Sequence, residues 1–472
     1  MNIHLRNFSN NFNNNITIMA IYLKKFSTHA EYDAYINGSG AILPNVSICE
    51  DTKDVHYNPY VETPHDYSQD YFTMVVTSGG DIKWSGSTTA NTLSYSKDNG
   101  DNWSAVTSAD TISVTVGDKV LWKGTPTPNS SGIGKFSGAT DVRYSVEGNA
   151  MSLLFSDDFK GQISLSNKSR ALRGLFSGST NVTSAKNLSL PATTLAERCY
   201  FAMFQGCTNL TTAPELPATT LASSGYTNMF QNCTSLTTAP ELPATTLANN
   251  CYTNMFKGCT SLTTAPELPA TTLVNICYNG MFNGCTSLTT APELPATTLA
   301  NNCYGNMFYG CASLTTAPEL LATTLVSSCY GGMFSGCTSL TTAPELPATT
   351  LAEGCYDSMF GGCTSLTTAP ELPATTLANN CYNCMFQGCT SLTTAPELPA
   401  TTLLQVCYRR MFDGCTSLSS IKCLATDISA SICTDNWVSG VAASGTFIKA
   451  SSMGSWTEGV NGIPSGWSVQ DA

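Results

Sequence analysis

A repeat of 26 residues constrains this chain more than any other feature. One copy, residues 242–267, reads LPATTLANNCYTNMFKGCTSLTTAPE, and nine copies follow one another without an insertion over residues 190–423. Periods of 20–50 residues are typical of stacked arrays, because one unit cannot bury its own apolar side and shares a core with its neighbours. The repeat therefore predicts a solenoid of stacked coils over about half of the 472 residues.

Each unit contains a segment with helical spacing. Its apolar residues recur at intervals of three and four, namely Ala248, Cys251, Met255 and Cys259. That spacing predicts a helix of about two turns with one apolar face. Asn249 or Asn250 can cap the start of this helix, and Gly258 suits its end.

The segment LTTAPEL, which begins at Leu262 and ends at Leu268, is predicted to be extended. Pro266 has no N–H group, so pairing between coils should weaken or bend there in every unit. Strict alternation would place Leu262, Thr264 and Leu268 on one face of the strand. The sequence leaves open whether Thr264 or Ala265 points into the core.

The repeated order L-x-x-A, L-P, A/V-x-x-C-Y-x-x-M-F-x-G-C-x-x-L resembles the BspA-like leucine-rich repeat of bacterial surface proteins. In that family a strand alternates with a short helix that carries an aromatic residue, a Gly and a Cys before the next Leu. The resemblance implies an α+β leucine-rich-repeat solenoid. This chain departs from the pattern by Pro and Glu in the strand region and by one extra Cys in each unit.

Less regular sequence flanks the repeats and divides the chain further. Residues 67–147 hold short alternating runs separated by turn residues, which predict a small all-β sandwich. Residues 1–66 are predicted to be a leader and an extended docking segment, and residues 148–189 a cap that contains a degenerate repeat. Residues 424–472 are predicted to hold a worn tenth repeat and a C-terminal cap.

All six tryptophans lie outside the nine repeats. Three of them are predicted to fill the core of the sandwich, namely Trp84, Trp103 and Trp122. The other three suit a lid over the last coil, namely Trp437, Trp456 and Trp467.

The charge balance excludes some classes of partner. The chain has 21 Lys and Arg against 33 Asp and Glu, a net charge of −12, whereas a nucleic-acid binder needs a basic face. No apolar run approaches the length that crosses a membrane. The apolar stretch at residues 16–23 precedes Lys24 and Lys25, the reverse of the order in a secretory signal, so no signal peptide is predicted.

The cysteines of the repeats form two columns that recur every 26 residues. The first contains Cys199, Cys251, Cys277, Cys303, Cys329, Cys355, Cys381, Cys407 and Cys433, and the second contains Cys207, Cys233, Cys259, Cys285, Cys311, Cys337, Cys363, Cys389 and Cys415. Cys251 and Cys259 would lie about 12 Å apart on a helix, too far for a disulfide, and metal sites use closer ligands and usually His. Both columns are therefore predicted to be free thiols in the core, which favours assembly in a reducing cytosol.

A third column consists of one glutamate per unit: Glu215, Glu241, Glu267, Glu293, Glu319, Glu345, Glu371 and Glu397. Stacked strands lie about 4.8 Å apart, and like charges at that distance in water repel by about 1 kcal/mol. A row of solvated carboxylates is the simpler interpretation. The alternative is a row of sites for a divalent cation or a basic ligand, although calcium prefers six to eight oxygen ligands.

Variation among the units concentrates on the side with helical spacing. Seven of its charged or aromatic members are Arg198, Lys257, Tyr309, Asp357, Arg409, Arg410 and Asp413. This variation fits drift at solvated positions. It also fits a recognition face with different ligand contacts in each unit, and these seven residues are then the candidate ligand-binding residues.

No motif indicates catalysis, and no cofactor is predicted. The segment SKDNGDNW, residues 96–103, matches the Asp-box of sialidase propellers, but it occurs once and fits a hairpin turn. His56 and His65 could bind a metal with Asp54 and Asp66, although ordinary surface use is the simpler interpretation. His4 and His29 belong to no ligand pattern.

The phrases AILPNVS and DVHYNP and the layout of the N-terminal third resemble structural proteins of tailed phages of gut Bacteroidales. That resemblance implies a virion fibre or decoration protein that docks on other virion proteins through residues 1–66. The repeats would then bind a host surface protein or a glycan, with no nucleic acid and no membrane insertion, and the oligomeric state stays open. The alternatives are a BspA-like adhesin on a bacterial cell surface and, more remotely, an ice-binding protein that uses the Thr rows.

Overall fold

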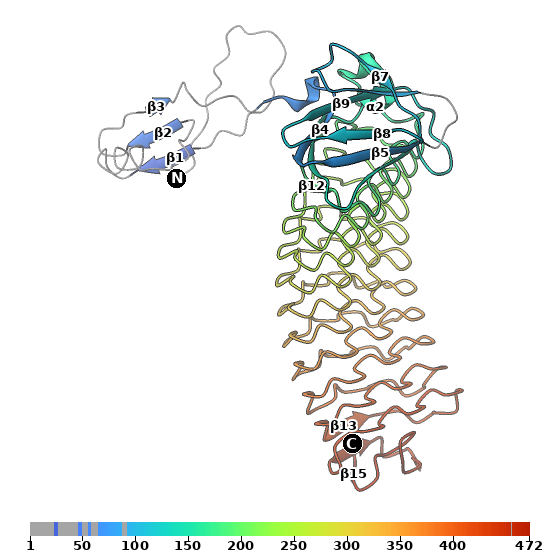
Figure 1. The fold of residues 1–472 in the computed structure, drawn as a ribbon. Coiled ribbons are helices and arrows are strands. Elements are labelled where there is room, and N and C mark those ends of the chain that lie inside the picture. The colour runs from blue at the N-terminus through green and yellow to red at the C-terminus, as the bar shows by residue number, and fades with distance from the viewer. Residues whose placement is uncertain (1–22, 27–45, 50–54, 58–64, 87–91, 455) are drawn as a thin grey trace. The chain divides into compact units, whose positions relative to one another are not determined.

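The computed structural model describes residues 23–26, 46–49, 55–57, 65–86, 92–454 and 456–472 (Figure 1). The chain divides into two compact units, Met1–Asp66 and Tyr67–Ala472. In the first unit β1 (Leu23–Phe26) pairs in parallel with β2 (Val46–Cys49), which pairs antiparallel with β3 (Val55–Tyr57). The rest of the predicted docking segment lies outside the described residues.

The second unit begins with two β-sheets, which follow a short 3-10 helix, η1 (Tyr67–Gln69). The six-stranded sheet has the order β12 (Val182–Ser189), β11 (Arg143–Asn149), β4 (Phe72–Ser78), β9 (Lys119–Gly124), β6 (Leu93–Ser96) and β7 (Ser104–Ala105). The three-stranded sheet has the order β10 (Gly134–Gly138), β5 (Gly80–Gly86) and β8 (Thr111–Val114). Two short helical turns follow β11, namely α2 (Ser152–Phe155) and η2 (Ser156–Phe159).

Aromatic side chains join the two sheets face to face. The ring of Phe136 on β10 lies 4.8 Å from Trp122 and 5.8 Å from Phe72 of the larger sheet, measured between ring centroids, and 4.7 Å from Trp84 on its own sheet. The buried positions predicted for Trp84 and Trp122 are confirmed. Trp103 is only half-buried, so its predicted place in the core is wrong. It follows the turn after β6 and packs at the edge of the sandwich.

The sandwich continues directly into the repeats. Strand β12 pairs in parallel with β11, and the Ala185 N–H on β12 donates to the Thr212 carbonyl of the first repeat at 3.0 Å. The Phe136 ring stacks on Phe176, which stacks on Phe204 of the first repeat, at 5.7 and 5.3 Å. One hydrophobic core therefore runs from the sandwich into the coils.

The segment with helical spacing is not a helix, and that prediction is wrong. In residues 248–259 the amide of every second residue donates to the next coil, as Tyr252 does to the Cys277 carbonyl (3.0 Å) and Phe256 to the Met281 carbonyl (2.9 Å). The amides between them close tight turns within their own coil, as Met255 N–H does onto the Tyr252 carbonyl. An α-helix would instead need each amide to donate four residues back along the same coil.

Left-handed residues at every fourth position produce these turns. Asn250, Asn254 and Gly258 have φ angles of 59°, 51° and 74°, values that a right-handed helix excludes. Asn and Gly tolerate this conformation better than other residues do. The two residues after Asn250 and the two after Asn254 are buried. A four-residue period of turns thus mimics the spacing of an amphipathic helix.

The extended side of each coil pairs with its neighbours only at isolated positions. Thr264 forms parallel bridges with Thr238 and Thr290, but no longer ladder follows. Ladders appear only at the two ends of the array, in β12 and in β13 (Ser420–Cys423), where Lys186 and Lys422 occupy the position of the repeated proline. The predicted weakening of strand pairing at the proline is therefore confirmed.

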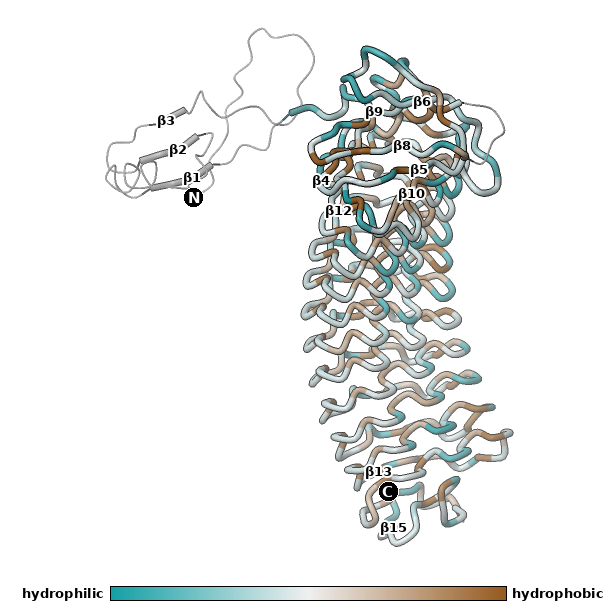
Figure 2. The backbone as a smooth tube through the Cα atoms, in the orientation of Figure 1, coloured by the Kyte–Doolittle hydropathy of each residue, from teal (hydrophilic) through white to brown (hydrophobic). Residues whose placement is uncertain are grey.

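The structure also shows whether Thr264 or Ala265 faces the core. Thr264 is exposed, whereas Ala265 is partly buried and packs against the core. Leu262 and Leu268 are buried. Few charged side chains lie along these coils, and the backbone of the repeats is largely pale or brown in Figure 2.

Equivalent aromatic side chains of successive coils stack on one another. Phe256 lies 5.6 Å from Phe230, and Tyr252 lies 5.7 Å from Tyr278, with ring planes within 6° of parallel. The Phe and Tyr columns run from the first repeat to the ninth. The array is thus a solenoid-like stack in which each coil buries its apolar side chains against the next.

The C-terminal residues cover the last coil. Strands β13, β14 (Thr446–Lys449) and β15 (Ser468–Asp471) form a parallel sheet. Trp437 is fully buried and stacks on Tyr408 at 6.2 Å and on Trp456 at 5.5 Å. Trp467 is also buried. The predicted covering role of these tryptophans is confirmed.

Ile276 gives a direct test of the left-handed positions. It has a φ of 61° at the position that Asn250 and Asn302 occupy in adjacent coils, and a β-branched residue is strained there. We expect Ile276→Asn to raise the free energy of unfolding by about 1 kcal/mol. The reverse change, Asn250→Ile, should lower it by a similar amount. Urea unfolding followed by circular dichroism measures both, and a stabilising Asn250→Ile would contradict the assignment.

Candidate functional site

Two exposed faces of the array are candidate binding surfaces. The strand-side face is formed in each unit by residues equivalent to 263–272, and the turn-side face by residues equivalent to 249–258. On the strand side, Thr263 and Thr264 are exposed, as are Thr271 and Thr272. The turns described above fix the turn-side positions. The turn-side face therefore projects from a regularly hydrogen-bonded backbone, whereas the strand-side face is held between coils by isolated bridges.

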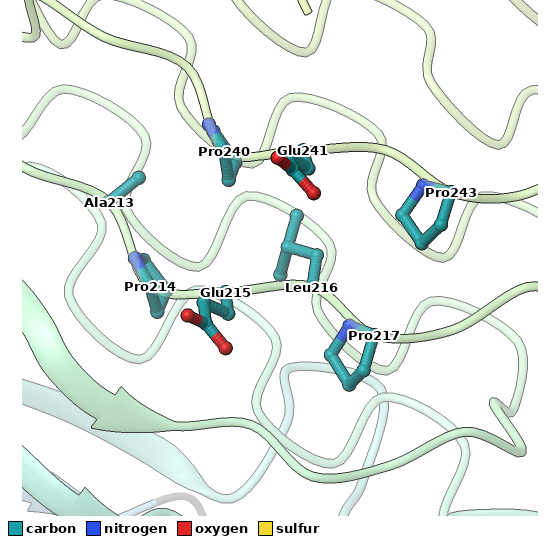
Figure 3. A pocket seen from close by; sticks show the side chains of 8 residues that line it. All are labelled: Ala213, Pro214, Glu215, Leu216, Pro217, Pro240, Glu241 and Pro243. Carbon is teal, nitrogen blue, oxygen red and sulfur yellow. The ribbon is translucent and has the colours of Figure 1, made fainter. Parts of the chain in front are cut away.

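The glutamate column lies between the two Thr pairs of the strand-side face. All eight side chains are exposed. Glu397 is the one member with an ion pair in the described part of the chain, to Lys422, whose Nζ lies 3.0 Å from Oε2. Glu215 and Glu241 of adjacent coils point the same way in Figure 3. The solvated row expected from the sequence agrees with this exposure.

A pocket opens between adjacent coils on this face. Its lining consists of Ala213, Pro214, Glu215, Leu216, Pro217, Pro240, Glu241 and Pro243 (Figure 3). The prolines form its apolar walls and the two carboxylates its polar groups. Every unit repeats most of this sequence, although Leu321 replaces the second proline in the sixth repeat.

Among the described residues no group of three or more His, Cys, Asp or Glu side chains could hold a metal ion. His56 lies on β3, where side chains are not described, and Asp54, His4 and His29 lie outside the described residues. His65 and Asp66 alone of that predicted set are described. The weak metal candidates therefore form no assembled site in this part of the chain.

We predict that calcium has no effect on the stability of the array. A single exposed carboxylate per coil provides too few oxygens for a Ca²⁺ ion, and a bound ion would raise Tm by mass action. Thermal unfolding with excess CaCl₂ and with EDTA should give the same Tm. A higher Tm with CaCl₂ than with EDTA would contradict this prediction if a Glu241→Gln and Glu267→Gln double variant lost the difference.

Three of the seven predicted ligand residues lie in separate parts of the turn-side face. Arg198 and Arg170 both lie 3.5 Å from Glu197 Oε1. Lys257 is half-buried in the third repeat. Tyr309 in the fifth repeat is 46% exposed. Nothing in the structure brings these three residues together.

The other four lie in the seventh and ninth repeats, around a cysteine of the eighth. Asp357, Arg409, Arg410 and Asp413 all interact electrostatically with Cys384. Cys384 belongs to neither column and is half-exposed, and its φ of 52° is left-handed. It was not predicted as a site residue. The signal for it was the replacement of Asn or Gly by Cys at this position of the repeat.

The two cysteine columns are free thiols in the core, as predicted. All eighteen members are buried and unpaired. In the second column each thiol donates to the carbonyl of a Phe in the preceding coil, as Cys259 Sγ does to Phe230 at 3.1 Å. Burial raises the pKa of Cys259 to about 12. Such thiols are poor nucleophiles and metal ligands at neutral pH.

The buried tyrosine and cysteine columns predict sensitivity to alkali. Burial raises the pKa of Cys259 from 9.0 to about 12 and raises that of Tyr252 well above 10. The unfolded chain thus loses protons that the folded chain keeps. Stability is therefore complete below pH 9 and falls as the pH rises toward 12.

Absorbance of phenolate and circular dichroism should be followed together between pH 8 and 13. The column tyrosines should ionise only when the ellipticity is lost. Their gradual ionisation in folded protein would contradict the buried columns.

The Asp-box segment forms the predicted hairpin turn. Asp98 Oδ1 accepts from Ser96 Oγ (2.7 Å) and from the Asn102 amide (2.9 Å), and Ser96 Oγ accepts from the Gly100 amide. These bonds lower the pKa of Asp98 to about 2. Trp103 ends the turn against Tyr71, at 5.0 Å between ring centroids. The turn is structural.

The stacked coils define a leucine-rich-repeat protein, and a family comparison agrees. The BspA type leucine rich repeat region family matches the chain in six copies, over residues 174–315, 249–393 and 333–436. These matches together span more than half of the chain, which belongs to this family. Membership is consistent with a surface-exposed repeat protein. No curated protein matches the chain.

A membrane span is a separate question from surface exposure. In the part of the chain that the structure describes, no helix has both the length and the apolar character needed to cross a bilayer.

Proposed function

We propose that this protein is a non-enzymatic adhesion protein whose repeats present a binding surface to a host-cell protein or glycan. The observation that carries the proposal is that different functional groups occupy the core and the surface of the array. Its thiols and phenols with raised pKa values are almost all buried, whereas its exposed faces consist of hydroxyl, amide and carboxylate groups at regular intervals. Such groups suit the recognition of a polar ligand.

A glycan suits these faces better than a nucleic acid does. Sugar hydroxyls both donate and accept hydrogen bonds, as do the exposed Thr hydroxyls beside the glutamate column. The acidic face would repel phosphates. Membership in the BspA-type family supports a role at a surface.

We place the protein on a phage particle, as a fibre or decoration protein that residues 1–66 attach to other virion proteins. The free thiols support this location. Eighteen unpaired cysteines in two columns suit a protein that folds in a reducing cytosol, where phage particles assemble. The second candidate is an adhesin on a bacterial cell surface, which membership in the BspA-type family supports. Ice binding is the least favoured, because the Pro and Glu columns separate the Thr rows.

Two measurements test the location and the activity separately. We predict that mass spectrometry of purified phage particles detects this chain, and absence from particles would exclude the virion role. Fluorescently labelled full-length protein should bind host cells, and pretreatment of the cells with periodate, which destroys sugars, should reduce that binding several-fold. Binding that resists periodate but is lost on protease treatment would identify a protein receptor instead.

A further inference from the structure

Charged residues on the turn-side face gather in the last repeats. Between residues 216 and 345 the turn-side positions carry a single charged residue, Lys257. The next four units, through residue 440, carry Glu353, Asp357, Arg409, Arg410, Asp413 and Asp435. Because coils are stacked in order, Asp357 lies two coils before Arg409, Arg410 and Asp413, and Asp435 lies one coil after them. This part of the face differs in chemistry from residues 216–345, although the first repeat also carries charged residues there, Glu197 and Arg198.

Neutral donors hold two of the carboxylates in place. Asp357 Oδ1 accepts from Asn383 Nδ2 at 3.1 Å, across to the next coil. Asp413 Oδ2 accepts from Gln387 Nε2 at 3.0 Å, across to the preceding coil. Neither carboxylate depends on an arginine for its orientation.

Arg409 and Arg410 have fewer and longer polar contacts than these carboxylates. Arg409 Nε lies 3.5 Å from Asp435 Oδ2, a long contact between half-buried groups. Arg410 Nε is buried and has no hydrogen-bond partner within the described residues. A buried N–H without an acceptor is rare. Because Nε itself is buried, a ligand would contact the outer nitrogens of this guanidinium, which form no ion pair within the described residues.

The backbone at Arg410 is also unusual. Its φ is 50°, at a position that Asn or Gly occupies in most other coils, although Ala202, Ser358 and Cys384 are also left-handed there. Asn is favoured in this left-handed conformation and Arg is not. Strained residues persist mainly where they serve a function. Strain and the unsatisfied Nε are independent observations on the same side chain.

The surrounding charges limit what can bind. A guanidinium with free N–H groups prefers a carboxylate or a similar oxyanion. Asp357, Asp413 and Asp435 nearby would repel a ligand with several negative charges. Their oxygens, with the amides of Asn383 and Gln387, suit the hydroxyl groups of a sugar.

We propose that Arg410, assisted by Arg409, binds the carboxylate of a singly charged acidic sugar on the turn-side face. The site rests on the proposed adhesion function and specifies its ligand class. Asp357, Asn383, Gln387 and Asp413 bind hydroxyl groups next to that carboxylate.

Calorimetry with full-length protein tests the site, using sialyllactose, which has one carboxylate, and lactose, which has none. The protein should bind sialyllactose about tenfold or more tightly, because one charge-assisted contact distinguishes the two sugars. Arg410→Asn should abolish this preference. Its Tm should equal or exceed that of the wild type, because Asn suits the left-handed position.

Arg198→Asn is the matched control, since Arg198 is also left-handed, with a φ of 55°, and lies in the first repeat. This variant should keep the preference for sialyllactose. An Arg410→Asn protein that keeps the preference, or an Arg198→Asn protein that loses it equally, would overturn the proposed site. Tighter binding of a heparin oligosaccharide than of sialyllactose would overturn it as well.

The cell-binding experiment separates this proposal from the adhesion function. Wild-type protein that binds host cells through periodate-sensitive sugars but shows no preference for sialyllactose overturns the carboxylate site alone. Wild-type protein that binds no cells overturns adhesion, and with it the biological role of the site.

Discussion

The rest of the structure depends on hydrogen bonds that run from every second amide of one coil to the carbonyls of the next. Tyr252 and Phe256 donate in this way, and so do their equivalents in each repeat. The bonds need a left-handed residue at every fourth position, which turns the chain so that alternate amides face the neighbouring coil. They fix the offset between coils and therefore force like residues into columns. The aromatic stacks and the thiol-to-carbonyl bonds of the second cysteine column follow from that offset.

The same constraint limits variation on the turn-side face. Asn254 Oδ1 lies over Gly280 of the next coil, where an added Cβ would come within 2.3 Å of it. Asn306 and Gly332 repeat this relation. A residue in one coil thus restricts its counterpart in the following coil. Arg410, Cys384, Ser358 and Ala202 depart from the Asn and Gly found at this position in the other coils, and Arg410 has the largest side chain among them.

The sequence predicted the parts of the fold that depend on periodicity and failed where backbone conformation decided. The 26-residue period was sufficient for the stack, the buried cysteine columns and the weak strand pairing at Pro266. It could not distinguish a helix from turns of four residues, because both bury pairs of residues at intervals of three and four. The repeated Asn250, Asn254 and Gly258 were the signal for turns, since these residue types favour the left-handed conformation and a right-handed helix excludes it. The prediction that Trp103 fills the core was wrong because this residue ends a turn and does not lie on a strand.

For the candidate site, the sequence supplied the residue types and the structure supplied their neighbours. The list of variable residues contained Asp357, Arg409, Arg410 and Asp413, but only the stacking of coils brings them together. It also contained Arg198, Lys257 and Tyr309, which share no neighbours. Spacing along the chain predicts which face a residue occupies. It does not predict which side chains satisfy one another's hydrogen bonds, and the unsatisfied Arg410 Nε is a property of that network.

The two faces imply different modes of binding. The strand-side face repeats one arrangement of Thr, Pro and Glu in unit after unit, so a repetitive ligand could engage many weak contacts at once and gain affinity from their number. The turn-side face varies from coil to coil, and the group of residues around Arg410 occurs once. Under the proposed adhesion function, the strand-side face would bind a polymer along its length, and Arg410 would recognise one acidic sugar. The regular coil allows the two faces to differ, because outward side chains can vary while the backbone hydrogen bonds between coils stay the same.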